Sequence, residues 1–177
     1  MSLFSATVQT EITAQQAAVF KHIVPIDLAS IFTGYGPLPS VAGTQNQTGA
    51  WDAAGQTRTV TFSDGSSASE LLTKYEYPRY FSYTVSGFTG ALRLLTTSAN
   101  GEWWFDTNPS SGATSIKWRY AFNARSVFAA PILWLITNIL WRGYMRKALT
   151  LSKAQIESSA AQQGVQPDGP ASGGPAG

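Results

Sequence analysis

Residues 128–158 read FAAPILWLITNILWRGYMRKALTLSKAQIES and predict one long C-terminal helix. Pro131 falls near its first turn, where a missing backbone N–H costs no intrahelical hydrogen bond. Only Gly143 interrupts the helix-forming residues that follow. In the second half, one face collects apolar and small residues at helical spacing, namely Trp141, Tyr144, Met145, Ala148, Ser152 and Ile156. We therefore expect that half to be an amphipathic helix that packs on a sheet.

The first half of this helix, 128–141, is apolar on nearly every side. A sheet covers only one side of a helix, so the remaining apolar surface needs another contact. The favoured interpretation is that one side faces a ligand cavity. The loop at 34–39 and the segment at 88–95 would then cover the other side.

Two other interpretations of the apolar half stay open. A homodimer would bury the side chains of its outer face, which are Ile132, Leu135, Ile136 and Ile139. Peripheral membrane contact, ranked last, would place nearby cations against lipid headgroups, and these are Arg125, Arg142, Arg146 and Lys147. The apolar run is itself too short to span a bilayer.

The length of 177 residues suits a single domain, predicted to cover 1–159. Residues 160–177 contain mainly Gln, Gly, Pro, Ala and Ser, a composition typical of a disordered tail. The net charge of +2 is too small to indicate a nucleic-acid partner. Cysteine is absent and His22 is the only histidine, so we expect no disulfide, no metal site and no cofactor. The first residues lack a secretory signal pattern, which predicts a cytoplasmic protein.

Short elements precede the long helix. Residues 4–12 alternate apolar and polar side chains, which predicts a strand, and two short helices follow at about 13–24 and 27–32. Further strands are predicted at 48–53, 57–63, 69–77, 80–86, 102–107 and 114–123. This order predicts an α+β protein in which a curved antiparallel sheet of about six to seven strands wraps on the C-terminal helix. The space between sheet and helix would be a pocket.

A series of short motifs adds a family resemblance. They are Gly49-Ala50-Trp51 followed by Gly55-Gln56-Thr57-Arg58, Asp64-Gly65 and Glu70, Tyr77-Pro78-Arg79 with Phe81-Ser82-Tyr83, and Trp118-x-Tyr120-x-Phe122. With these motifs in this order, residues 3–157 resemble the START/Bet v 1-like (SRPBCC) superfamily, especially its polyketide cyclase/dehydrase and lipid-transport branch. The resemblance implies the helix-grip fold and the binding of hydrophobic ligands such as lipids, sterols or polyketides. Only some members are enzymes, and no catalytic motif carries over to a particular residue of this chain.

Aromatic side chains at alternate positions on consecutive strands form the candidate binding site. On the strand at 69–77 we expect Leu71, Thr73, Tyr75 and Tyr77 to face alike. Tyr and Trp combine apolar rings with polar groups that need partners when buried, a combination typical of a small-molecule pocket. The predicted ligand-binding residues are Tyr75, Tyr83, Trp118, Tyr120, Phe122, Trp134, Asn138 and Trp141, with Asn138 as the polar group of the helix.

No catalytic residue is assigned, and the weak candidates for acid or base groups are Glu102, Asp106 and Tyr120. Glu102 and Asp106 alternate along one strand with Trp103 and Phe105. Because burying unpartnered acids is costly, we expect the two aromatic residues to point inward and the acids to face water.

Two further polar groups have a structural and a functional interpretation. Arg58 is expected to pair with Glu70 across the Asp64-Gly65 hairpin on the outer surface, although an inward Arg58 could hold a ligand carboxylate. His22 falls near the end of the first short helix, where the helix dipole favours a cation. We prefer that role for His22 over general base catalysis.

Taken together, the sequence predicts a non-enzymatic carrier or sensor of a hydrophobic small molecule of lipid, polyketide or aromatic type. The alternative is a cofactor-free cyclase or dehydratase that uses the cavity Glu, Asp or Tyr as acid and base. A third possibility is an interaction module that works through the apolar helix.

Overall fold

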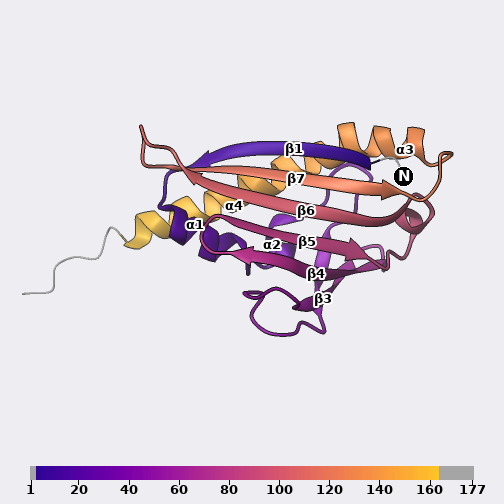
Figure 1. The fold of residues 1–177 in the computed structure, drawn as a ribbon, viewed down its shortest axis with the longest axis horizontal. Helices are drawn as coiled ribbons and strands as arrows, with labels where there is room; N and C mark the ends of the chain where they lie inside the picture. The colour runs from indigo at the N-terminus through magenta and orange to yellow at the C-terminus, as the bar shows by residue number, and fades with distance from the viewer. Residues whose placement is uncertain (1–2, 164–177) are drawn as a thin grey trace, which may run out of the picture.

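The sheet is a single seven-stranded antiparallel layer in a computed structural model that describes residues 3–163. Its strands are β1 (Leu3–Ile12), β2 (Val41–Gln45), β3 (Thr57–Phe62), β4 (Ser67–Glu76), β5 (Tyr80–Ser86), β6 (Thr96–Thr107) and β7 (Thr114–Ala124). Their spatial order is β1-β7-β6-β5-β4-β3-β2, so the first strand returns beside the last. The sheet curves over the C-terminal helix, as the α+β helix-grip prediction requires (Figure 1).

The predicted C-terminal helix is confirmed, and it has three parts. These are α3 (Ala130–Leu135), a π-helical segment η2 (Ile136–Trp141) and α4 (Arg142–Gln163). Of the side chains predicted to face the sheet from its second half, Trp141 is half-buried and the others, including Met145 and Ser152, are buried. The helix continues to Gln163, into the stretch predicted to be disordered; residues 164–177 lie outside the described part of the chain.

Three short helical elements connect strands of the sheet. Helix α1 (Gln16–Ile23) and helix α2 (Leu28–Ile31) follow β1, and a 3₁₀ turn, η1 (Ala91–Leu94), precedes β6. The Asp27 side chain caps α2 by accepting from the Ala29 N–H at 3.1 Å. Helix α1 has Gln15 at its N-cap position and no side-chain cap there, and the preceding Thr13 N–H donates to Glu157 Oε1 at 3.1 Å.

The strand predicted at 48–53 is also wrong. Gly49 and Trp51 have φ values of 77° and 62°, left-handed conformations that do not continue a β ladder. This segment is a loop that folds the Trp51 side chain into the core, where only 1% of it is exposed. The strand next to β3 is β2 instead.

An irregularity in β4 changes which residues face inward. The pairing of β4 with β5 shifts register between Leu72 and Lys74. Before the shift, Leu72 is buried like Ala68 and Glu70, while Leu71 and Thr73 are exposed. After the shift, Tyr75 packs against Phe20 with ring centroids 5.4 Å apart. The shared face predicted for Leu71, Thr73, Tyr75 and Tyr77 is wrong, because a regular alternation does not survive a bulge.

Candidate ligand cavity

A cavity of about 290 Å³ lies between the inner face of the sheet and the C-terminal helix. Strands β3 to β7 supply its floor, and Ile136, Leu140 and Trp141 of η2 supply part of its wall. Its lining is mostly apolar, with a few polar groups among the aliphatic and aromatic side chains. This combination is the usual form of a small-molecule site.

Two segments close the cavity. From one side come Pro37, Leu38 and Pro39 of the loop predicted to cover the helix, and Tyr144 donates its hydroxyl to the Pro39 carbonyl at 2.7 Å. Lys147 Nζ holds the same loop by donating to the Gly34 carbonyl at 2.9 Å. The second segment contributes the wall residues Phe88, Ala91, Leu92 and Leu95. The part of the favoured interpretation that places a cavity against the helix is confirmed for Ile136, Leu140 and Trp141. The predicted cover of its other side by these two segments is wrong, because Ile132, Leu135 and Ile139 are 49% to 56% exposed.

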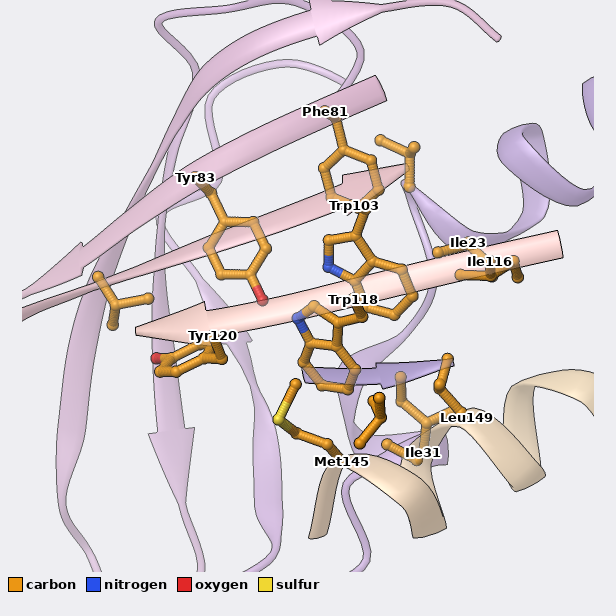
Figure 2. Packing of buried hydrophobic residues seen from close by; sticks show 14 of the residues in the cluster. Ile23, Ile31, Phe81, Tyr83, Trp103, Ile116, Trp118, Tyr120, Met145 and Leu149 are labelled. Atoms are coloured by element: carbon orange, nitrogen blue, oxygen red, sulfur yellow. The ribbon is translucent and has the colours of Figure 1, made fainter. Parts of the chain in front are cut away.

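One end of the sheet–helix interface is solid. The indole rings of Trp103 and Trp118 stack with centroids 4.4 Å apart, and Phe81 stacks on Trp103 at 5.6 Å. Figure 2 shows Trp118 beside Met145 of α4. Trp118 is fully buried and is not a wall residue of the cavity. The cavity begins where this aromatic packing ends.

Tyr83 and Tyr120 mark that boundary, because both line the cavity and both are almost completely buried. Figure 2 shows the Tyr83 hydroxyl directed toward the indole nitrogens of Trp103 and Trp118. Burial raises the pKa of each tyrosine well above its ordinary value, and the negative charge of Glu70 raises both further. Both phenols are consequently protonated at neutral pH and can donate a hydrogen bond.

The charged groups of the cavity are Arg58 and Glu70. Arg58 Nε donates to Glu70 Oε2 at 2.7 Å, and only 6% and 10% of the two side chains are exposed. The guanidinium lies over the ring of Trp51, 4.1 Å from its centroid, in cation–π geometry. All three residues line the cavity.

The predicted pairing of Arg58 with Glu70 is confirmed, but its predicted place on the outer surface is wrong. The two residues are direct partners across β3 and β4, and their neighbours at alternate positions, Val60 and Ala68, are buried. The pair therefore belongs to the inner face. The shared face of Arg58, Val60 and Phe62 was the available signal, and the buried Trp51 was not foreseeable from the sequence pattern.

The predicted ligand-binding residues separate into two groups. Tyr83, Tyr120 and Trp141 lie at the cavity wall. The others do not: Trp118 and Phe122 pack in the core, Tyr75 packs on Phe20, Trp134 is 54% exposed, and Asn138 donates its side-chain amide to the Trp134 carbonyl. For Tyr83, Trp118, Tyr120 and Phe122 the period-2 pattern identified the inner face correctly, but it did not show which of these residues pack in the core and which border the cavity.

Of the acid and base candidates, only Tyr120 reaches the cavity. Glu102 lies on the outer face, where its carboxylate accepts from Arg119 Nη1 at 3.0 Å and from the Tyr80 hydroxyl at 3.2 Å, and Asp106 is exposed. A cavity role for these two acids is therefore wrong, whereas the inward orientation predicted for Trp103 and Phe105 is confirmed. His22 is not a wall residue either.

Within residues 3–163, no three His, Cys, Asp or Glu side chains gather closely enough to hold a metal ion. In the same part of the chain, no helix combines the length and the apolar character needed to cross a membrane.

A curved antiparallel sheet that grips a long helix around an apolar cavity defines the helix-grip class of proteins. The chain belongs to the polyketide cyclase/dehydrase and lipid transport family, whose model matches residues 4–157. A search of curated protein sequences gives no match.

Solved structures of low sequence identity share the fold. Norcoclaurine synthase from Thalictrum flavum, a point mutant in complex with a transition-state analogue, is 13% identical with a TM-score of 0.66, over 90% of this chain and 97% of that one. XoxI from Bacillus cereus is 15% identical with a TM-score of 0.62, over 89% and 98% of the two chains. Ara h 8.0201 is 14% identical with a TM-score of 0.61, over 89% and 99%. These likenesses concern the fold alone.

Proposed function

We propose that this protein binds a hydrophobic small molecule of lipid, polyketide or aromatic type in its cavity and acts as a carrier or sensor. The observation that supports this most is the cavity itself, which has about 290 Å³ of space behind mostly apolar walls. Membership of a polyketide cyclase/dehydrase and lipid transport family supports the same class of ligand. We also propose a cytoplasmic location, which fractionation of cells would test.

The groups at the wall support a carrier more than an enzyme. The carboxylate of Glu70 is engaged by Arg58, and the phenols of Tyr83 and Tyr120 keep their protons at neutral pH. A general base must accept a proton at the working pH, which neither phenol does, and the Glu70 carboxylate is held by the Arg58 cation. Binding needs only apolar walls and a few directional polar contacts.

Binding can be tested by titrating a library of fatty acids, alcohols and polyketides while the tryptophan fluorescence is recorded. Trp51, Trp103 and Trp141 line the cavity, so we expect a saturable change of their emission. Leu140→Trp should fill part of the cavity and weaken binding by about tenfold or more. Leu71→Trp, on an exposed position of β4, is the matched control and should leave binding unchanged. If no ligand of the library changes the tryptophan fluorescence of the wild-type protein, the proposal is refuted.

A cyclase or dehydratase is the second candidate, and the two phenols at the wall favour it. A protonated, buried Tyr83 or Tyr120 is suited to donate a hydrogen bond to a carbonyl oxygen of a folded polyketide chain as negative charge develops there. If the protein is such an enzyme, it should turn over a polyketide substrate, and Tyr83→Phe or Tyr120→Phe should lower kcat by about a hundredfold. Binding without turnover in the wild-type protein would favour the carrier.

A further inference from the structure

We propose that the Arg58–Glu70 pair binds the hydroxyl head of an uncharged amphiphile, such as a long-chain alcohol or a sterol-like molecule. The inference rests on the proposed function and names the ligand class of the same cavity. Within the described residues, the Nε–Oε2 contact is the only hydrogen bond of either side chain.

The pair is deeply buried, and several of its hydrogen-bonding groups have no partner among the described residues. A guanidinium has five N–H donors and a carboxylate has two acceptor oxygens, so the two Nη groups of Arg58 and Oε1 of Glu70 remain available. In the part of the chain that the structure describes, none of these atoms is among the fully buried side-chain atoms that lack a partner, so they reach the open space of the cavity. Both residues line a cavity whose other walls are mostly apolar. A ligand in that cavity can supply the missing partner.

The net charge of the pair selects the kind of partner. The Arg58 cation and the Glu70 anion already neutralise each other at 2.7 Å. A ligand carboxylate would bring a second anion beside Glu70 into a largely apolar space, and burying that uncompensated charge is costly. A hydroxyl group stays neutral, accepts from an Arg58 Nη–H and donates to Glu70 Oε1.

The surroundings hold the pair in position for this contact. The ring of Trp51 covers the guanidinium at 4.1 Å, and the β3–β4 register places Arg58 directly opposite Glu70. Tyr83 and Tyr120 lie within the electrostatic reach of Glu70, whose charge raises the pKa of both phenols. The body of the ligand would extend from this polar end along the apolar wall formed by Ile136 and Leu140.

Three probes with the same hydrocarbon chain test the head group by calorimetry at about pH 8, where free carboxylic acids are ionised. Decanol can accept and donate, decyl methyl ether can only accept, and decanoate is an anion. We expect decanol to bind about tenfold more tightly than the ether and more tightly still than decanoate. Equal binding of all three, or tighter binding of decanoate, would overturn the inference and leave the proposed function intact. If none of them binds, the proposed function is itself in question.

The double variant Arg58→Met/Glu70→Leu replaces the two charged side chains by apolar ones of similar volume. Proteins often tolerate the removal of both charges of a buried pair together. In this variant the preference for decanol over the ether should disappear while binding of the chain remains. The matched control is Arg119→Met/Glu102→Leu, which removes the pair of the outer face and should keep the preference. Retention of the preference in the inner double variant would overturn the inference.

An exposed apolar surface surrounds α3 and is separate from the Arg58–Glu70 pair. We infer that this surface docks on an anionic lipid membrane. It comprises Leu94, Val127, Phe128, Ile132, Trp134, Leu135 and Ile139, whose exposed fractions range from 49% to 88%. A contiguous patch of large apolar side chains at the surface indicates an interaction site.

The charges beside the patch identify the partner. Arg93 and Arg125 are exposed next to Leu94 and Val127, and Arg125 Nη1 donates to the Arg93 carbonyl at 3.2 Å, which keeps the two segments together. Between Asp106 and Glu157 the sequence contains no acidic residue. Apolar and aromatic side chains flanked by arginines match the interface of an anionic bilayer. In a symmetric dimer through the same patch, like charges would face each other instead.

The patch also shares a helical segment with the cavity. Leu135 and Ile139 point to solvent, while the neighbouring Ile136 and Leu140 line the cavity. Helix α3 lies at the end of the molecule opposite the C-terminal end of α4, where it remains free to meet a flat surface (Figure 1). A docked protein would therefore hold its cavity next to the lipid from which an apolar ligand can enter.

Co-sedimentation with vesicles tests the docking. We expect the protein to bind vesicles of phosphatidylcholine with phosphatidylglycerol, with a blue shift of tryptophan emission that is lost in Trp134→Phe. Phe128→Ser/Leu135→Ser should weaken binding by about tenfold or more, whereas Leu71→Ser, at an exposed site on β4, should not. Arg125→Gln should weaken binding to the anionic vesicles only. No vesicle binding by the wild-type protein, or a dimer that Phe128→Ser/Leu135→Ser dissociates, would overturn this inference.

Discussion

The molecule contains two Arg–Glu pairs with nearly the same local geometry and very different surroundings. Arg58 and Glu70 face each other across β3 and β4, and Arg119 and Glu102 face each other across β6 and β7. The contacts are 2.7 Å and 3.0 Å long, respectively. The first pair lies on the inner face with its side chains 6% and 10% exposed, and the second on the outer face at 38% and 26%.

The difference shows how the side of the sheet decides what a pair of charges does. Water screens the outer pair and can replace either partner, so its contribution to stability is small. The inner pair has no such replacement, and the loss of one partner leaves a charge in an apolar cavity. Each pair also has a tyrosine beside it, Tyr80 on the outer face and Tyr83 on the inner face. The two faces can therefore also be compared through the effect of each tyrosine on stability at alkaline pH.

Removal of one arginine from each pair should give the largest contrast. Arg58→Met leaves the Glu70 carboxylate buried without its cation and should lower the free energy of unfolding by about 3–5 kcal/mol. Arg119→Met should lower it by no more than about 1 kcal/mol. Urea unfolding of the two variants measures both values. Equal losses would contradict the contrast between the faces.

A methyl group added beneath Tyr83 should have the next largest effect. A Cβ at Gly101, which lies opposite Tyr83 across β5 and β6, would overlap the Tyr83 ring. Gly101→Ala should therefore cost about 1–3 kcal/mol and shift the Tyr83 hydroxyl at the cavity boundary. Gly43→Ala on β2 is the control, because its added Cβ would meet no atom within 4 Å. Thermal unfolding of both variants checks the expectation, which an unaffected Gly101→Ala protein would contradict.

Alkaline pH should destabilise the protein through its buried phenols. Burial raises the pKa of Tyr83 above the value of about 10 that it has in the unfolded chain. Between these two pKa values the folded state binds more protons, so the stability present below about pH 10 is lost as the pH rises, by up to about 1.4 kcal/mol per pH unit for each such phenol.

The two tyrosines should differ in this test. The pKa of the part-buried Tyr80 is raised as well, first by burial, with its Ser82 hydrogen bond opposing the rise and the Glu102 charge adding to it. We expect Tyr83→Phe to flatten the alkaline decline of the unfolding free energy more than Tyr80→Phe does. Urea unfolding at a series of pH values gives the comparison, and a larger effect of Tyr80→Phe would contradict it.

Removal of both inner charges should have the smallest effect on stability. Arg58→Met/Glu70→Leu replaces the pair by apolar side chains of similar length, and its free energy of unfolding should lie within about 1 kcal/mol of the wild type. The large decrease in the free energy of unfolding expected for Arg58→Met alone would then be caused by the uncompensated charge of Glu70. A double variant as unstable as the single one would instead assign the loss to side-chain packing.

Much of the fold was predictable because its signals are local. The alternation in Thr114–Ala124 and the helical spacing from Tyr144 to Ile156 identify buried faces without any knowledge of the partner element. The predictions that failed involve backbone irregularities. The register shift after Leu72 and the left-handed Trp51 break the period on which the sequence argument depends.

The candidate site was less predictable for a related reason. Periodicity places Trp118 and Tyr120 on the same inner face, but one fills the core and the other borders a cavity. The difference depends on which side chains pack against each residue. Those side chains come from the loop at 34–39, the segment at 88–95 and η2. Those contacts join residues that are distant in the sequence.

The sequence by itself determined the helix-grip order, the inner and outer faces of β1, β5, β6 and β7, and the pairing of Arg58 with Glu70 across a hairpin. These features follow from side-chain alternation and short-range spacing, which are properties of the chain. Only the tertiary structure decided that this pair is buried under Trp51, that the interface is hollow beside Tyr83 and Tyr120, and that the side chains around α3 remain exposed. Burial depends on the sum of all neighbours in space, and no local pattern contains that sum.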